Sequence, residues 1–320
     1  MSINSKYRIG VPLRDIKKSI ECYAILFAVN LTRVFPKKIL YRVAKTAVKR
    51  SYDAKPSRIA KIRDRISSAF PMARNSEIDA MVSDFIEHLA SLLVELVLIF
   101  TDRFDFDSMV VNAEDVRRRM DEARKMEKGI IVLSAHYGNW EAMAHWMAIN
   151  GYRSSVVVRP HKNGCLDKKV FIPFRERHGN RSIERKGAIV AMARELRRKG
   201  VVGLMIDQMI PPPNDVETTL FGRPFHAMKS ASQLHEKYES PVLLVLCERV
   251  GREKFFMHLS GPLEYNFDEN EDLDSKIAHG TQYYLDELTE VIKRNPPQWL
   301  WSYDRWRVPK TKKESEDTSV

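Results

Sequence analysis

The segment 129–141, GIIVLSAHYGNWE, combines an apolar strand with a polar turn. Its residues 130–135 are apolar or small without interruption, which predicts a strand inside a sheet. His136 follows directly, Gly138 allows a tight turn, and residues 139–150 are predicted to form a helix. A strand, a turn and a helix in this order predict one unit of an α/β fold whose turn presents a histidine.

The chain after this segment alternates between the same two kinds of element. We predict strands at 154–159 and 201–206. A strand pair is predicted at 241–250 and 254–260, joined by a turn at Gly251. The fold class is therefore α/β, with a largely parallel central sheet flanked by helices. The helices predicted here are 188–199, 229–237 and 274–294.

The residues before the first strand predict helices at 57–70, 76–100 and 114–128. The first places Ile59, Ile62 and Ile66 on one face, and the second is apolar nearly all round, as a core helix is. These patterns divide the chain into a basic arm with apolar stretches that is predicted to associate with a membrane, a folded body and a tail. Their bounds are 1–56 for the arm, 57–308 for the body and 309–320 for a disordered tail.

Positive charge is concentrated at the N-terminus. The 320 residues carry a net charge of +11, whereas residues 1–65 hold 17 Lys and Arg against 4 Asp and Glu, and the remainder sums to −2. Apolar stretches at 22–31 and 39–50 lie among these basic residues, which favours helices in the headgroup layer of an anionic membrane. The alternative is a solvated basic helix packed on its own domain. A span needs about 20 apolar residues, so whether residues 20–35 cross the bilayer stays open.

Composition narrows the class of protein further. A hydrophobic share of 44% and a charged share of 30% are those of a globular chain. The three cysteines are far apart and match no metal spacing, so we expect a reducing compartment and no disulfide. Residues 1–20 do not resemble a cleavable signal peptide. No metal or other cofactor is expected, because the paired-histidine helical signature is absent.

Polar side chains follow three of the predicted strands. They are His136 after the first strand, Arg159 after the second, and Asp207 with Gln208 after the third. Functional sites in open α/β sheets gather at the carboxyl ends of strands. These three strand ends therefore predict the functional site.

His136 is the candidate general base, because a neutral imidazole is available near neutral pH. Glu141, one helical turn further on, is placed to orient it. No serine or cysteine stands out as a nucleophile; Ser134 is possible, but it lies two residues before His136, so the histidine and glutamate would have to fold back onto it. A base without a protein nucleophile suggests direct deprotonation of a substrate hydroxyl. The alternative is a buried histidine beside a helix-capping residue. Trp299, Trp301 and His145 are predicted to be core residues.

The stretch His136-Tyr-Gly-Asn-Trp-Glu141 resembles the HxxxxE motif of the bacterial lipid A biosynthesis acyltransferases, the lauroyl and myristoyl transferase family. The resemblance extends in order over residues 58–308. It departs at Asp304-Arg305-Trp306, where the family often has His-Arg-Arg, and this affects the acceptor more than the reaction class. The other matching blocks are Ala69-Phe-Pro71 with the helix to Glu95; Arg159-Pro160 with Asn163; Arg181-Ser182, Arg185 and Gly187; 203–208; Phe221-Gly222 with Pro224; and Pro297-Gln298-Trp299-Leu-Trp301 with Arg305.

This resemblance implies a mechanism. His136 would remove a proton from an acceptor hydroxyl while Glu141 orients His136, and the hydroxyl would attack an acyl thioester without an acyl-enzyme. Backbone N–H groups near Gly138–Trp140 are the candidate oxyanion donors. Arg159 would hold a phosphate of the donor or acceptor. The catalytic residues implied are His136 and Glu141, and the substrate-binding residues are Arg159, Asn139, Arg181, Arg185, Asp207 and Gln208.

The resemblance also implies partners and a location. The donor would be a thioester of acyl carrier protein or coenzyme A, and the acceptor a hydroxyl of a lipid A precursor. Residues 175–199 carry a net charge of +6, which suits an acidic carrier protein. The location would be the cytoplasmic face of the bacterial inner membrane, on an anionic surface and without nucleic acid. The alternatives are another amphiphilic acceptor, such as a phosphatidylinositol mannoside or other glycolipid, and a non-catalytic basic membrane-surface binding protein.

Overall fold

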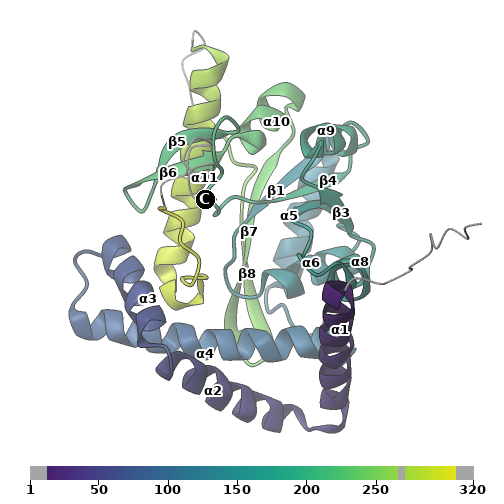
Figure 1. Ribbon diagram of the computed structural model, residues 1–320. Helices are drawn as coiled ribbons and strands as arrows, with labels where there is room; N and C mark the ends of the chain where they lie inside the picture. The colour runs from purple at the N-terminus through teal and green to yellow at the C-terminus, as the bar shows by residue number, and fades with distance from the viewer. Residues whose placement is uncertain (1–12, 266–270, 308–320) are drawn as a thin grey trace, which may run out of the picture.

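The computed structural model describes residues 13–265 and 271–307 (Figure 1). The predicted tail and the first 12 residues of the predicted arm lie outside the described residues. The chain before the sheet is helical, as predicted, and a 3-10 turn, η1 (Thr32–Val34), separates its first two helices. The helices are α1 (Leu13–Leu31), α2 (Lys37–Asp53), α3 (Pro56–Ala69), α4 (Asn75–Phe100) and α5 (Ala113–Lys125).

The central sheet has six strands in the order β3-β2-β4-β1-β7-β8. All neighbouring pairs are parallel except β7 and β8, which form the predicted antiparallel pair. This arrangement confirms the α/β class with a largely parallel sheet. The strands are β1 (Ile130–Ser134), β2 (Ser154–Val158), β3 (Arg181–Glu184), β4 (Val201–Met205), β7 (Val242–Gly251) and β8 (Lys254–Ser260).

Several elements were not anticipated from the sequence. Strand β3 is short and lies at the sheet edge, and β5 (Asp215–Leu220) pairs with β6 (Arg223–Met228) in a separate hairpin. The connection from β2 to β3 winds through α7 (Gly164–Leu166), a π-helical stretch η2 (Asp167–Phe171) and α8 (Ile172–Glu176). Four helices agree with the predicted ones: α6 (Trp140–Ile149), α9 (Ala188–Arg197), α10 (Ser230–Tyr238) and α11 (Leu273–Arg294). The 3-10 turn η3 (Pro296–Gln298) follows α11 and was not predicted.

The two faces of the sheet belong to two hydrophobic clusters, because successive side chains of a strand point to opposite faces. In β1, Ile131 and Leu133 pack in a cluster with residues of α3, α9, α10 and α11. Ile130 and Val132 pack in the other cluster, with residues of α5 and α6. Helix α4 contributes to both clusters and runs across the foot of the molecule (Figure 1). The sheet is therefore covered on both faces, which leaves its edges for a site.

Helices α1 and α2 form the arm of the described structure. Helix α2 packs along α4 (Figure 1), with Ala44 buried between them, while α1 stands to one side of the body. Large apolar side chains of the arm remain exposed, including Phe27 at 71% and Val34 at 73%. Among the described residues, no helix is long and apolar enough to cross a bilayer.

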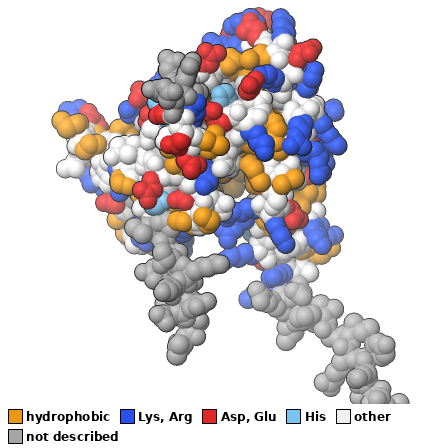
Figure 2. All heavy atoms as spheres, turned by 90° about the horizontal axis from the view of Figure 1, so that it is seen from above, with side chains coloured by type: hydrophobic (Ala, Val, Ile, Leu, Met, Phe, Trp, Pro, Cys, Tyr) orange, Lys and Arg blue, Asp and Glu red, His pale blue; other side chains and the backbone are white. Residues whose placement is uncertain are grey.

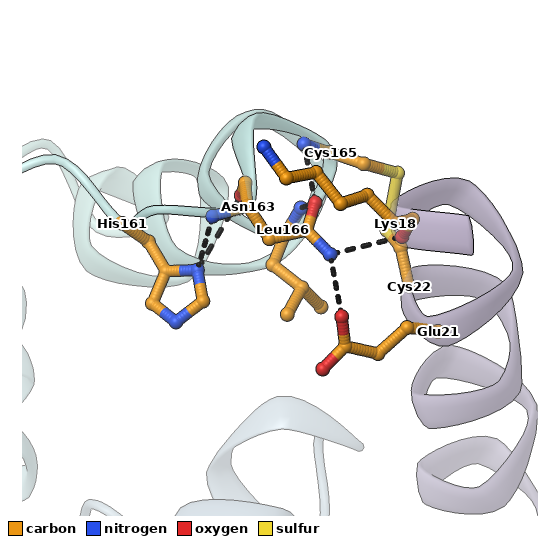
Figure 3. The surroundings of a disulfide bond; sticks show 7 residues. All are labelled: Lys18, Glu21, Cys22, His161, Asn163, Cys165 and Leu166. Carbon is orange, nitrogen blue, oxygen red and sulfur yellow. Dashed lines mark hydrogen bonds between the residues drawn. A yellow bond between two sulfur atoms is a disulfide. The ribbon is translucent and has the colours of Figure 1, made fainter. Parts of the chain in front are cut away.

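A disulfide joins α1 to the segment after β2, so the expectation of no disulfide is wrong. Cys22 of α1 is bonded to Cys165 of α7, 143 residues later (Figure 3). Asn163 reinforces the junction, because its side-chain amide donates to the carbonyl of Lys18 at 2.9 Å and to Glu21 at 3.0 Å. Cysteine spacing missed the pair because the fold, and not the local sequence, brings these two residues together.

Candidate active site

The carboxyl ends of β1 and β4 bring His136 and Asp207 into contact. The two strands are adjacent and parallel, with Ser134 opposite Met205, so the residues two positions further along also lie side by side. Nδ1 of His136 is 2.8 Å from Oδ1 of Asp207. The backbone N–H of His136 donates to Oδ2 of Asp207 at 3.1 Å. One carboxylate thus holds both the ring and the main chain of the histidine.

Asp207 is fully buried and is held by two residues of the C-terminal segment. Arg305 donates to its Oδ2 at 2.6 Å and Trp299 donates to the same oxygen at 3.0 Å. Burial by itself raises the pKa of Asp207, but the charges and hydrogen bonds of His136 and Arg305 outweigh it and hold that pKa below its usual range. The carboxylate therefore stays ionised, and the buried Arg305 supplies its counter-charge.

The other ring nitrogen of His136 faces the side chain of Gln208. Nε2 of His136 lies 3.3 Å from Nε2 of Gln208. An ionised Asp207 only accepts, so Nδ1 carries the proton and Nε2 keeps its lone pair. The Gln208 amide then donates to that lone pair. The ring is 18% exposed, and its Nε2 is the basic atom of the site.

The turn of residues 136–140, called here the His136 turn, is fixed by backbone contacts on both sides. The Gly138 N–H donates to Gln298 at 2.9 Å and the Asn139 N–H donates to Cys247 at 3.1 Å. Gly138 has a φ of +58°, and a Cβ on it would lie 1.6 Å from the Cys247 carbonyl oxygen. Only glycine fits this close approach between the turn and β7.

The predicted oxyanion donors are only partly available. Gly138 and Asn139 give their N–H groups to carbonyls, as described, and the Ala142 N–H donates to the side chain of Asn139 at 2.9 Å. Within the part of the chain that the structure describes, the N–H groups of Trp140 and Glu141 have no partner. They are the first amides of α6, where helices leave donors unsatisfied and carry partial positive charge. These two amides are the better candidates.

Glu141 contacts Arg175 and not His136. Its Oε1 lies 3.5 Å from Nε of Arg175 on α8. The carboxylate at Nδ1 of His136 is Asp207, so the orienting contact expected of Glu141 is made by a residue that we had placed among the substrate-binding candidates. Glu141 lies at the start of α6 and is 17% exposed. It belongs to the rim of the site together with Arg175.

The predicted substrate-binding residues separate into two groups. Arg159 and Arg185 follow the paired strands β2 and β3, which end at Val158 and Glu184. Both arginines therefore lie at the carboxyl ends of the parallel strands, as His136 does, and both are exposed. Arg181 begins β3 and therefore lies toward the opposite edge, where it pairs with Glu195 at 3.2 Å. Arg181 does not join the site.

Asn139 and the basic segment also differ from expectation. Asn139 is fully buried, and its side chain is committed to Ala142 and Glu95, so it has no exposed atom for a substrate. Seen from above, Lys and Arg side chains gather on the side of the molecule where α9 lies (Figure 2). Those of α9 and its C-terminal end, away from the His136 edge, are Arg194, Arg197, Arg198 and Lys199. This cluster is a solvated helix face.

Among the described residues, no serine, threonine or cysteine is hydrogen-bonded to the His136 ring. The ring is hydrogen-bonded to Asp207 and Gln208, and the centroid of the Trp140 ring lies 5.0 Å from its own. Arg305 and Trp299 were named in the sequence only as parts of a C-terminal block, and their contact with Asp207 was not foreseen. The signal that could have revealed it is an arginine beside tryptophans in a segment without a predicted element. Trp299, Trp301 and His145 are buried, as predicted.

The fold and site define a class: an α/β protein with a histidine–carboxylate pair at the carboxyl end of a parallel sheet, in which the second ring nitrogen of the histidine faces a glutamine amide and no serine, threonine or cysteine among the described residues is hydrogen-bonded to the ring. Comparison with known families then gives the particular group. Residues 12–308 match the family described as "Bacterial lipid A biosynthesis acyltransferase", and the chain belongs to this family. The predicted family is thus confirmed. No curated protein matches the sequence.

Proposed function

We propose that the protein transfers a fatty acyl chain from an acyl thioester, with acyl carrier protein as the preferred donor, to a hydroxyl of a lipid A precursor. The observation that carries the proposal is the geometry of His136, whose Nδ1 is 2.8 Å from the buried Asp207 and whose Nε2 keeps its lone pair. The family is one of acyltransferases, which supports the reaction class. The acceptor rests on the family's description, and the carrier protein is preferred as donor because the exposed Arg159 and Arg185 near the site suit an acidic partner.

The proposed reaction needs one proton transfer in each direction. Nε2 of His136 takes the proton of the acceptor hydroxyl as the oxygen attacks the thioester carbonyl carbon. The carbonyl oxygen becomes negative and is stabilised by the N–H groups of Trp140 and Glu141. When the carbon–sulfur bond breaks, the imidazolium returns its proton to the departing thiolate. Asp207 keeps the ring oriented and stabilises the imidazolium, as the third member of a catalytic triad does.

The rim of the site supplies positive charge for phosphates. Arg159 and Arg185 are exposed at the same sheet edge as His136. Arg175 lies against Glu141, and its side chain is 34% exposed. Guanidinium groups bind phosphate through paired hydrogen bonds. In this proposal Glu141 positions Arg175, and the three arginines bind phosphates of the acceptor or of the donor arm.

The proposed setting is the cytoplasmic face of a bacterial inner membrane. Its support is the exposed apolar surface of α1 and α2, which alternates with Lys17, Lys18, Lys37 and Lys38. A helix with this pattern lies in the interfacial layer without spanning it. The family is typically membrane-associated. Both substrates proposed here are amphiphilic or carry an acyl chain, so a site near a lipid surface suits them.

The test is acyl transfer by the purified protein in detergent, with acyl-loaded carrier protein and a tetra-acylated lipid A precursor. We expect a lipid product heavier by one acyl chain, detected by mass spectrometry, and a loss of activity of roughly 10²- to 10⁴-fold in His136→Ala. Acyl-coenzyme A in a parallel reaction decides the donor. Donor consumption without a heavier lipid would discard the acceptor. If the protein neither consumes any of several donors nor forms a product, the proposal that it is an enzyme is wrong.

A further inference from the structure

A second polar network supports the His136 turn from the side opposite Asp207. Nδ2 of Asn139 donates to Oε2 of Glu95 at 2.8 Å, and Nη2 of Arg249 donates to the same oxygen at 2.6 Å. Glu95 lies on α4, Arg249 on β7 and Asn139 in the turn. Glu95 and Asn139 are fully buried. Three segments that are distant in the sequence therefore meet on one carboxylate oxygen.

The network reaches the turn at more than one point. His88 is seven residues before Glu95, so the two share a face of α4, and His88 interacts with the backbone of Gly138. Gln298 exchanges two hydrogen bonds with the backbone of Arg249, at 2.7 and 2.8 Å, and accepts from the Gly138 N–H. Helix α4 and the C-terminal segment thus both contact the turn, at Gly138 and Asn139.

This network is not expected to contribute much to the stability of the fold. Oε1 of Glu95, Nε and Nη1 of Arg249, Nδ1 of His88 and the Tyr41 hydroxyl are buried without partners among the described residues. Buried ion pairs of this kind often contribute little net stability, since desolvation offsets their attraction. The network does, however, fix the orientation of the first turn of α6. Asn139 caps α6 through Oδ1 while Glu95 fixes its Nδ2, so the start of α6 has one orientation.

We propose that Glu95 is a positioning residue, which acts through Asn139 to set the direction of the first amides of α6 relative to His136. The proposal rests on the proposed acyl transfer and deepens it. Glu95 touches neither His136 nor the space beyond it; it determines where the Trp140 and Glu141 N–H groups point. Those groups stabilise the oxyanion in the mechanism above, and oxyanion stabilisation depends on donor placement within a fraction of an ångström.

The electrostatics of the cluster agree with this geometry. Burial raises the pKa of Glu95 to about 7, while Arg249 and Asn139 act in the opposite direction and Glu253 adds to the rise. Ionisation strengthens its hydrogen bond to Asn139, because charge-assisted bonds are the stronger ones. The titratable groups that interact electrostatically with Glu95 are Arg249 and Cys247 of β7, Glu253 of the β7–β8 turn and Tyr41 of α2. His88, on the same face of α4, interacts with Arg249.

The test exchanges donor and acceptor across one hydrogen bond. Glu95→Gln weakens the contact, and Asn139→Asp keeps the helix cap but sets two carboxylates against each other. The double variant restores a donor–acceptor pair with reversed direction. We expect kcat to fall about tenfold in Glu95→Gln and about 100-fold in Asn139→Asp, with KM changed less than threefold. The double variant should exceed Asn139→Asp at least tenfold, a coupling that a double-mutant cycle measures.

Thr281→Val is the matched control. Its hydroxyl pairs with Ser232 at 2.9 Å, both residues are buried, and neither contacts the His136 turn. We expect it to lower Tm and leave kcat unchanged. If the Glu95 and Asn139 variants lower Tm in the same way with kcat intact, or if their effects on kcat simply multiply in the double variant, the positioning role is wrong.

A second measurement separates this proposal from the proposed function. Hydrogen exchange followed by mass spectrometry on the substrate-free protein reports the turn directly, through peptides that cover residues 136–146. Exchange there should be about tenfold faster in Asn139→Asp and should recover in the double variant, while α11 peptides stay unchanged. This result would support the positioning role even if wild type transferred no acyl chain. Unchanged exchange in all variants would overturn it whether or not the enzyme is active.

Discussion

The His136 turn and the arm are held in opposite ways. Residues 137–139 of the turn are buried, and the contacts of the turn come from four separate segments through Asp207, Gln298, Cys247 and Glu95. The arm shows large apolar side chains to solvent, and its hydrogen bonds to the body include those from Arg103 to the carbonyls of Thr32 and Phe35, both 2.8 Å. The His136 turn is held in a single geometry, whereas the arm exposes an apolar surface to its surroundings. Changes in the first should affect chemistry, and changes in the second should affect attachment.

The sharpest way to test the first half of this comparison is Asp207→Asn. The neutral amide keeps the shape but favours the wrong histidine tautomer and cannot stabilise an imidazolium, so kcat should fall roughly 10²- to 10⁴-fold. KM should change little, because Asp207 is buried behind the ring. Steady-state transfer assays in detergent measure both constants. A loss confined to KM would mean that Asp207 binds substrate, as the sequence first suggested.

The same substitution predicts a difference in acid stability. Because the folded-state pKa of Asp207 lies below the usual value of about 3.9, its ionised form stabilises the fold above that pH, and this contribution is lost as pH falls toward the folded pKa. The stability gap between wild type and Asp207→Asn should therefore be larger at pH 6 than at pH 3. Denaturant unfolding at both pH values checks it, and an equal gap would contradict the role of the buried charge.

The next largest effect is expected from Gly138→Ala, because the turn has no room for it. The new Cβ would lie 1.6 Å from a backbone oxygen of β7, so the turn or the strand must move, at a cost of about 3 to 5 kcal/mol of unfolding free energy. Gly151→Ala is the control. Gly151 also has a positive φ, +88°, but open space around it, so it should lose about 1 kcal/mol. Chemical denaturation compares the two, and equal losses would show that the left-handed φ, and not the close approach, is what matters.

The sequence predicted β1, β2, β4, β7, β8 and the long helices of the body, because each carries its own pattern of apolar residues, but it did not predict β3, β5 or β6. It also predicted that His136 and Asp207 belong to the site, because polar residues that follow buried strands are visible locally. It paired His136 with Glu141 and not with Asp207, since Glu141 is five residues away and Asp207 is 71. The true neighbour follows from β1 lying beside β4 in register. Strand order is set by packing of the whole chain, and no local pattern records it.

Contacts made by irregular segments could not be predicted from the sequence either, because they too depend on how the whole chain packs. Arg305 and Trp299 lie in a stretch without a strand or long helix, yet they neutralise and fix Asp207. The disulfide between Cys22 and Cys165 depends on where α1 docks. The family resemblance placed Asn139 at the substrate, whereas its side chain is buried against Glu95 of α4. Each of these cases couples residues more than 40 positions apart.

The arm offers the smallest effect on chemistry and the clearest test of the second half of the comparison. Phe27 is 71% exposed on α1, and transfer of its ring into an apolar layer contributes about 2 kcal/mol. Phe27→Ser should therefore weaken binding to anionic phospholipid vesicles by more than tenfold, while kcat in detergent stays within twofold of wild type. Vesicle co-sedimentation measures the first quantity and the transfer assay measures the second.

Met72→Ser is the matched control for that change. Met72 is 94% exposed but lies in the connection between α3 and α4, and so is not part of α1 or α2. If exposed apolar area of any kind drove attachment, both variants would detach from vesicles equally. If the arm is the attachment surface, only Phe27→Ser will, and high salt will weaken the remaining binding further, because the lysines beside the apolar positions interact with lipid headgroups. If wild type and both variants bind vesicles equally, the exposed apolar surface of the arm is not the site of membrane attachment.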